Sequence, residues 1–168
     1  MLISPPTVEQ EKTSTATTPV KYAADEVVLP FRALINSMDF RAELADLGIG
    51  PLQVLRRKKT LRELRALSIA LWGLALQKSF PQDAGEFFVR YAETDPLLNA
   101  SGKEPGKLRQ RLEEYIQLLD IKKDRDFLPV AGHLAEKITP KSKDLARIRL
   151  KLSLIIRNLY TLIFEKLV

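Results

Sequence analysis

The sequence predicts an all-α protein, a single-domain bundle of five or six helices. Residues 52–80 contain no proline and one internal glycine, and their leucines recur at steps of three and four, which places them on one face of a helix. Residues 141–168 contain neither glycine nor proline and run far beyond the roughly five or six residues of an average strand. The two longest segments of the chain therefore both favour helix.

The chain length fits one domain preceded by a disordered N-terminal tail. Its 168 residues can bury enough surface to fold without a metal or a disulfide. Residues 1–20 are rich in Thr, Ser, Pro and Glu and show no apolar period, so we expect a flexible tail there and one helical domain over residues 21–168. Apolar residues at 27–29, directly before Pro30, predict a short extended segment that leads into this domain.

The first helix is expected over residues 37–47. Asn36 or Ser37 can cap its start, and Gly48 ends it. Residues 52–80 then begin almost at once. Two helices should therefore meet across a very tight turn.

The helix over residues 52–80 is the one around which the bundle is organised. From Ala66 to Leu76, apolar residues cover every side of the cylinder with two interruptions, as in a helix surrounded by others. Trp72 lies within this run and is expected in the core. The remaining helices should pack around this part of the chain.

Three shorter helices are expected over residues 83–93, 106–120 and 129–138. A capping box and an aromatic face support the first, a proline in the first turn and apolar positions at steps of three and four support the second, and an opening proline supports the third. The loop at residues 94–105 is rich in turn formers, and residues 122–126 form an exposed charged turn.

The last helix is expected over residues 142–168. Its second half is apolar over more of its circumference than one core contact requires. Either this helix runs through the centre of the bundle, or it presents a stripe to a partner, most simply the same helix of a second copy. A homodimer through the C-terminal helix is therefore one prediction.

Positive charge is concentrated in two segments. The chain has a net charge of +6. Residues 52–80 carry seven basic side chains against Glu63, and residues 139–168 carry seven against Asp144 and Glu165. Such asymmetry suggests an acidic partner, whether a protein, a nucleic acid or an anionic membrane, although surface cations also serve solubility. The predicted contact residues are Arg56, Arg57, Lys58, Lys59 and Arg62.

The turn before the basic segment, Gly48 to Pro51, resembles the hairpin of helix-hairpin-helix DNA-binding motifs. In that family, backbone NH groups of the hairpin and the start of the following helix hold a phosphate. The resemblance implies this role for Gly48 and Gly50 and departs from the family pattern at Val54 and Arg57.

Few residues point to catalysis or to a cofactor. The absence of cysteine excludes disulfides, thiolate metal sites and cysteine nucleophiles. His133 and Glu136 have the i, i+3 spacing that brings side chains together, but the sequence places no third ligand or nucleophile beside them. The adjacent carboxylates of Glu113 and Glu114 point apart on a helix. We expect no enzyme, no metal and no cofactor.

The predicted function is that of a helical interaction or adaptor protein, which docks an acidic or amphipathic partner through its basic helix face. The alternative is nucleic-acid binding through the glycine turn and the same cations. The longest uncharged run has twelve residues, against about 20 for a membrane span, and no signal peptide is apparent. We therefore expect a cytoplasmic protein.

Overall fold

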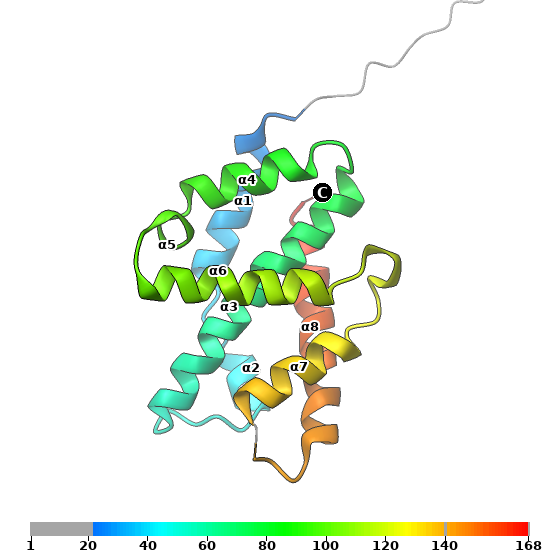
Figure 1. The fold of residues 1–168 in the computed structure, drawn as a ribbon. Coiled ribbons are helices and arrows are strands. Elements are labelled where there is room, and N and C mark those ends of the chain that lie inside the picture. Colours follow the sequence, from blue (N-terminus) through cyan, green and yellow to red (C-terminus); the bar gives the residue numbers. More distant parts are fainter. Residues whose placement is uncertain (1–21, 140, 168) are drawn as a thin grey trace, which may run out of the picture.

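The computed structural model describes residues 22–139 and 141–167, which fold into a bundle of helices (Figure 1). These residues form eight α-helices and one short 3-10 helix, and they contain no strand. The predicted all-α class is confirmed, with more helices than the five or six expected. The predicted tail at residues 1–20 lies outside the described residues.

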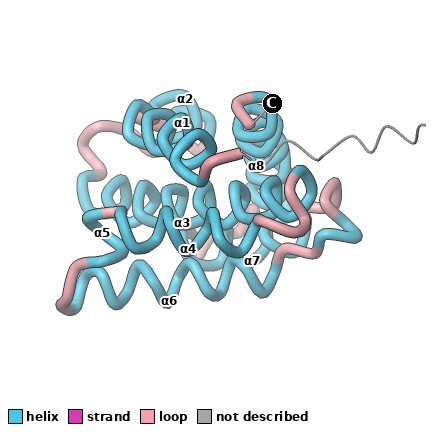
Figure 2. Tube along the Cα trace, turned by 90° about the horizontal axis from the view of Figure 1, so that it is seen from above, coloured by secondary structure: helices cyan, strands magenta, loops and turns pink. Residues whose placement is uncertain are grey.

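Helix α3 (Val54–Ser79) is the central element, as predicted. Seen from above, α6 lies on one side of α3, and α1, α2 and α8 lie on the other (Figure 2). The described helices leave Leu64, Leu67, Leu71 and Trp72 with no exposed surface. An apolar run on every side of a helix is stable here because other helices cover each side.

Helix α1 (Ala24–Ser37) replaces the predicted extended segment, which was wrong. Val27, Val28, Phe31 and Ile35 are buried at helical spacing and pack toward α3 and α4 (Ala84–Thr94). The Phe31 ring stacks on Trp72 with 4.4 Å between ring centroids. Tertiary packing therefore outweighs Pro30, which stands inside α1 on its exposed side.

The single helix predicted over residues 37–47 is interrupted. Asn36 and Ser37 end α1 instead of capping a new helix, and α2 (Arg41–Asp46) starts four residues later. Phe40 adopts a left-handed backbone conformation with φ of 53° and is buried. Burial of this ring accompanies a conformation that costs about 1 to 2 kcal/mol for a residue with a side chain.

The predicted loop at residues 94–105 contains a helical turn, α5 (Pro96–Asn99), and the beginning of α6 (Lys103–Leu118). Asp95 is 2% exposed, and its carboxylate accepts hydrogen bonds from the backbone NH groups of Leu97 and Leu98. The Tyr91 hydroxyl donates to the same side chain at 3.0 Å. A buried capping residue thus orders a segment whose composition alone indicates a loop.

The C-terminal part follows the predicted order. A 3-10 turn, η1 (Ile121–Lys123), precedes α7 (Leu128–Ile138) and α8 (Leu145–Glu165). One face of α8 packs against α3 and α7, while its opposite face remains in water. Among the described residues, no helix combines the length and the apolar character needed to cross a bilayer.

Candidate docking surface at the start of α3

The start of α3 carries an exposed apolar tip, formed by Leu52, Val54 and Leu55. Leu52 is 96% exposed and Leu55 is 85% exposed, while Val54 is about half-exposed. This end of α3 lies at the lower left in Figure 1, away from α8. Most of the apolar surface of the tip faces water. A partner that covered it would gain about 25 cal/mol of free energy for each Å² of apolar surface buried.

Four cations, the basic run Arg56 to Lys59, follow the tip directly. Lys58 and Lys59 are exposed, and the two arginines are half-buried. Arg56 donates from Nη1 to Gln53 Oε1 at 3.2 Å. Within residues 22–139 and 141–167, none of the four forms an ion pair, so their charge is available to a partner.

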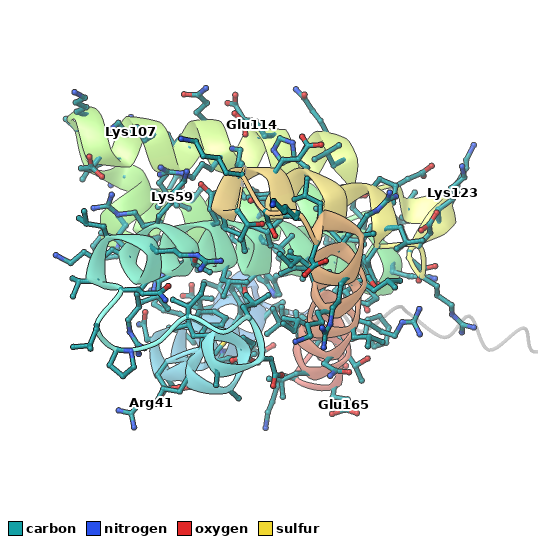
Figure 3. The ribbon with its side chains drawn as sticks, turned by 90° about the horizontal axis from the view of Figure 1, so that it is seen from below. Arg41, Lys59, Lys107, Glu114, Lys123 and Glu165 are labelled. Atoms are coloured by element: carbon teal, nitrogen blue, oxygen red, sulfur yellow. The ribbon has the colours of Figure 1, made fainter. Side chains whose placement is uncertain are left out.

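Arg62, the fifth predicted contact residue, is tied to α6. Its Nη1 lies 3.4 Å from Glu104 Oε2, and Lys107 Nζ lies 3.2 Å from the other oxygen of the same carboxylate. The hydrogen bond from Lys107 and the charge of Arg62 lower the pKa of Glu104. Figure 3 shows Lys59 and Lys107 on the same side of the molecule, where α3 and α6 pack together. Cations of α6 therefore border the basic run.

Gly48 shapes the turn between α2 and α3. Its φ is +69°, a left-handed conformation that favours glycine. The Gly48 NH donates to the Ala45 carbonyl and the Ile49 NH donates to the Leu44 carbonyl, both at 2.9 Å. This is the hydrogen-bond pattern of a Schellman cap, completed by the buried side chains of Leu44 and Ile49. The two amides are therefore occupied in closing α2.

A cleft of about 650 Å³ opens beside this turn. Gly48, Gly50, Arg41 and Arg57 all contribute to its walls. Gly50 has no left-handed conformation, and no heavy atom lies within 4 Å of the position that a Cβ would take there. Three predicted site residues thus meet at one cleft, beside Arg41, whose Nε lies 3.0 Å from Asp39 Oδ2.

The departures from the helix-hairpin-helix pattern are both accessible features. Val54 belongs to the exposed tip, and Arg57 reaches the cleft. The helix that precedes the turn, α2, is short, with six residues. The groups at this turn that remain for a phosphate are the Gly50 amide and the first amides of α3, which have no acceptor within their own helix.

A buried charged network lies behind the surface, between α3, α6 and α7. Glu63 is 2% exposed, and its carboxylate accepts hydrogen bonds from Arg111 Nε at 2.7 Å and from the Tyr115 hydroxyl at 2.6 Å. Lys137 Nζ lies 3.9 Å away. Burial, and then the charge of Glu63, raise the pKa of Tyr115, so its phenol stays protonated as a donor. These groups satisfy one another and join three helices.

His133 pairs with Glu114 and not with the predicted Glu136. His133 Nε2 lies 3.3 Å from Glu114 Oε2, and Lys137 donates to the same carboxylate. The bond from Lys137, aided by His133, lowers the pKa of Glu114. Glu136 is exposed. Across the part of the chain that the structure describes, no group of three or more acidic, His or Cys side chains is arranged for a metal ion.

Two features of the site were missed at the sequence level. The exposure of Leu52 and Leu55 was missed because both fit a helical apolar stripe. The burial of Glu63 had a signal, since Leu67, four positions later on the same face, belongs to the core. Comparison of the chain with protein-family models, curated proteins and solved structures finds no match.

Proposed function

We propose that this chain is a non-catalytic docking protein whose apolar tip and basic run bind an acidic or amphipathic partner protein. The observation that supports this is the direct succession of exposed apolar side chains and cations without ion pairs at one end of α3. Protein interfaces commonly combine an apolar centre with a charged rim. A cytoplasmic location remains a prediction of the sequence.

The two parts of the surface make different contributions. Complete burial of an exposed Leu or Val side chain contributes about 1.5 to 3 kcal/mol, so the tip can supply much of the affinity. Charges at a rim mainly raise the association rate and exclude partners of like charge. Binding should therefore weaken with salt but persist in part, because the apolar contribution remains.

Affinity capture from the source cell tests this proposal with four versions of the chain. Wild type is compared with the tip variant Leu52→Ser/Leu55→Ser and with a variant in which all four cations of the basic run become Glu. The control reverses four other exposed lysines and so changes the net charge equally: Lys122, Lys123, Lys141 and Lys143. We expect one partner that wild type and control retain and that both α3 variants lose. A partner retained by both α3 variants would refute the proposed surface.

Nucleic-acid binding is the second candidate, favoured by the cleft that brings Gly48 and Gly50 beside Arg41 and Arg57. Fluorescence anisotropy with a mixed-sequence duplex and a single strand tests it at low and moderate salt. Logarithmic affinity should fall with logarithmic salt by about 0.9 for each duplex phosphate contacted. Reversal of the basic run should abolish binding while the lysine control binds. No binding at low salt excludes this candidate.

Self-association through α8 is a separate prediction about partners. Leu150 is 60% exposed and Leu154 is 58% exposed on the face of α8 that other described helices leave open. Light scattering behind size exclusion, over a range of concentrations, measures the mass directly. A dimer that Leu150→Ser/Leu154→Ser converts to monomer would support this prediction, and a monomer at all concentrations would contradict it.

A further inference from the structure

A groove runs along α8 where the segment that links η1 to α7 lies beside it. It consists of two adjoining cavities of about 420 and 620 Å³. Arg125, Phe127 and Arg157 contribute to the walls of both cavities, so the two lie side by side. We call this feature the α8 groove. It lies on a different part of the molecule from the start of α3 (Figure 1).

One end of the α8 groove is an aliphatic surface in water. Leu150 and Leu154 stand one turn apart on α8 and are both more than half exposed. Leu128, at the start of α7, is 39% exposed and lies in the same cavity wall. Three leucines that converge on one cavity form an anchor site for an apolar side chain.

The other end is aromatic and contains an unused polar group. Phe127, Tyr160 and Phe164 form its apolar wall, with centroid distances of 5.5 and 5.9 Å from the Tyr160 ring. Tyr160 is 9% exposed, and its buried hydroxyl has no hydrogen-bond partner among the described residues. Burial, followed by the nearby charge of Asp124, raises the pKa of Tyr160 and keeps this hydroxyl a donor. The three aromatic rings therefore form an anchor site for an apolar side chain at this end of the groove.

The middle of the groove carries two arginines, while the walls of the two cavities together hold three basic and three acidic side chains: Lys78, Arg125 and Arg157, and Asp124, Asp126 and Glu165. Arg125 and Arg157 are exposed, and neither forms an ion pair within residues 22–139 and 141–167. Asp124, on the same wall, is paired with Lys78. Asp126 accepts a hydrogen bond from the Leu128 amide, so a bound acidic side chain would meet two guanidinium groups that form no ion pair of their own.

Charge also decides between a second copy and a different partner. α8 carries four basic side chains against Glu165 alone, so two copies packed through this helix would bring like charges together. An acidic partner has the complementary charge. The four basic residues of α8 are Arg147, Arg149, Lys151 and Arg157.

We propose that the α8 groove binds a helical segment of an acidic partner protein, with an apolar anchor at each end and a carboxylate between them. The two anchor sites lie ten residues apart on α8, from Leu150 and Leu154 to Tyr160 and Phe164. This separation corresponds to about 15 Å of helix, so a partner helix of about 15 residues spans it. Arg125 and Arg157, which line both cavities, hold the central carboxylate.

Anisotropy with a labelled synthetic peptide tests this second docking site on the full-length protein. The probe is a capped helix of about 15 residues, with leucines at one end, two glutamates in its middle and a phenylalanine at the other end, all on one face. A second peptide carries lysines in place of the glutamates. We expect binding of the first peptide only, weakened at least about tenfold by Arg125→Glu/Arg157→Glu and by Leu150→Ser/Leu154→Ser.

Controls separate this site from the surface at the start of α3. Lys122→Glu/Lys123→Glu makes the same charge change outside the groove, and reversal of the basic run tests the other surface. Both should leave peptide affinity within about twofold. Circular dichroism and thermal unfolding establish that each variant is folded. Failure of the peptide to bind leaves the α3 proposal intact, and loss of the α3 partner leaves the groove intact.

Isotope labelling of the tyrosines gives one NMR signal for each ring and reports on the groove independently of any affinity measurement. The chain contains four tyrosines, and Tyr160→Phe identifies one signal among them. Peptide addition should shift the Tyr160 signal and leave those of the buried Tyr91 and Tyr115 in place. Three results would overturn the proposal: no peptide binding, binding unaffected by reversal of Arg125 and Arg157, or a stable dimer through α8 that the peptide does not displace.

Discussion

Glu63 places a negative charge inside the packed face of α3. Removing a carboxylate from water is unfavourable by several kcal/mol unless good partners replace the water. Arg111 and Tyr115 both donate to Glu63 at 2.7 Å or less, so the partners are present and well placed. The network therefore favours one relative position of α3 and α6, because a shift of either helix would leave a buried charge without its partner.

Replacement of Glu63 by glutamine should destabilise the fold. Glu63→Gln keeps the side-chain size but removes the charge that neutralises Arg111, which is 19% exposed at its side chain. We expect a loss of about 3 kcal/mol in the free energy of unfolding, measured with urea. Glu113→Gln, at an exposed position of α6, should change it by less than about 0.5 kcal/mol. Equal effects of the two variants would show that the buried pair is unimportant.

The two glycines of the α2–α3 turn should respond differently to alanine. Gly48→Ala puts a Cβ on a residue with φ of +69° and should lower stability by about 1 to 2 kcal/mol. Gly50→Ala meets neither a left-handed backbone nor a neighbouring atom, and should leave stability unchanged or raise it by up to about 1 kcal/mol. Thermal unfolding of both variants distinguishes the positions. A destabilising Gly50→Ala would indicate a constraint on the turn that this geometry lacks.

At the scale of elements, α3 divides into an exposed start and a buried remainder. We predict that leucines at the exposed start contribute to binding and that leucines in the buried remainder contribute to stability. Leu52→Ser/Leu55→Ser should change the free energy of unfolding by less than about 0.5 kcal/mol, because both side chains are largely in water. Leu67→Ala should lose about 2 to 5 kcal/mol, because Leu67 has no exposed surface. A large loss from the first variant would mean that the apolar tip serves the fold rather than a partner.

The helices α4, α6 and α7 were predicted from capping residues, prolines and apolar spacing, within a few residues of their observed bounds. The two longest elements were predicted from their length and apolar period. α3 and α8 have 26 and 21 residues, enough for the apolar period to outweigh any local ambiguity. α1 was missed because Pro30 argued locally against helix while its apolar face packs on α3 and α4. α5 was missed because its four residues are ordered by Asp95, whose burial depends on the tertiary structure. Local patterns do not contain such distant contacts.

At the scale of the whole molecule, the same limit applies to the candidate site. The identity of the cations and of Gly48 and Gly50 could be predicted, because charge and turn chemistry are local properties. Which of those groups remain without an intramolecular partner could not be predicted, because that depends on contacts with other elements. Arg62 is paired with Glu104 of α6, and the Gly48 amide is used by α2. The α8 groove likewise exists only after α7 and α8 pack together.

Alkaline pH should unfold the molecule through its two most buried tyrosines. Burial raises the pKa of Tyr91 and Tyr115 above the ordinary value of 10.0, with further contributions from Asp95 and Glu63 respectively. Below pH 10 the phenols are protonated in both states, and this contribution to stability is fully present. Above it the unfolded chain releases two protons that the folded chain holds at these tyrosines, so the two together should lower stability by about 2.7 kcal/mol per pH unit. Tyr160, whose pKa burial also raises, adds to this fall.

Urea unfolding at a series of pH values above about 9 measures this slope. Tyr115→Phe should reduce it by about 1.4 kcal/mol per pH unit, although the variant starts from a lower stability because Glu63 loses a donor. Tyr22→Phe, at a tyrosine that is 48% exposed, is the matched control and should retain the full slope. A slope that Tyr115→Phe leaves unchanged would mean that Tyr115 titrates equally in both states. The ion-pair network between α3, α6 and α7 would then have to be open to water in solution, and its role in fixing those three helices would fail with it.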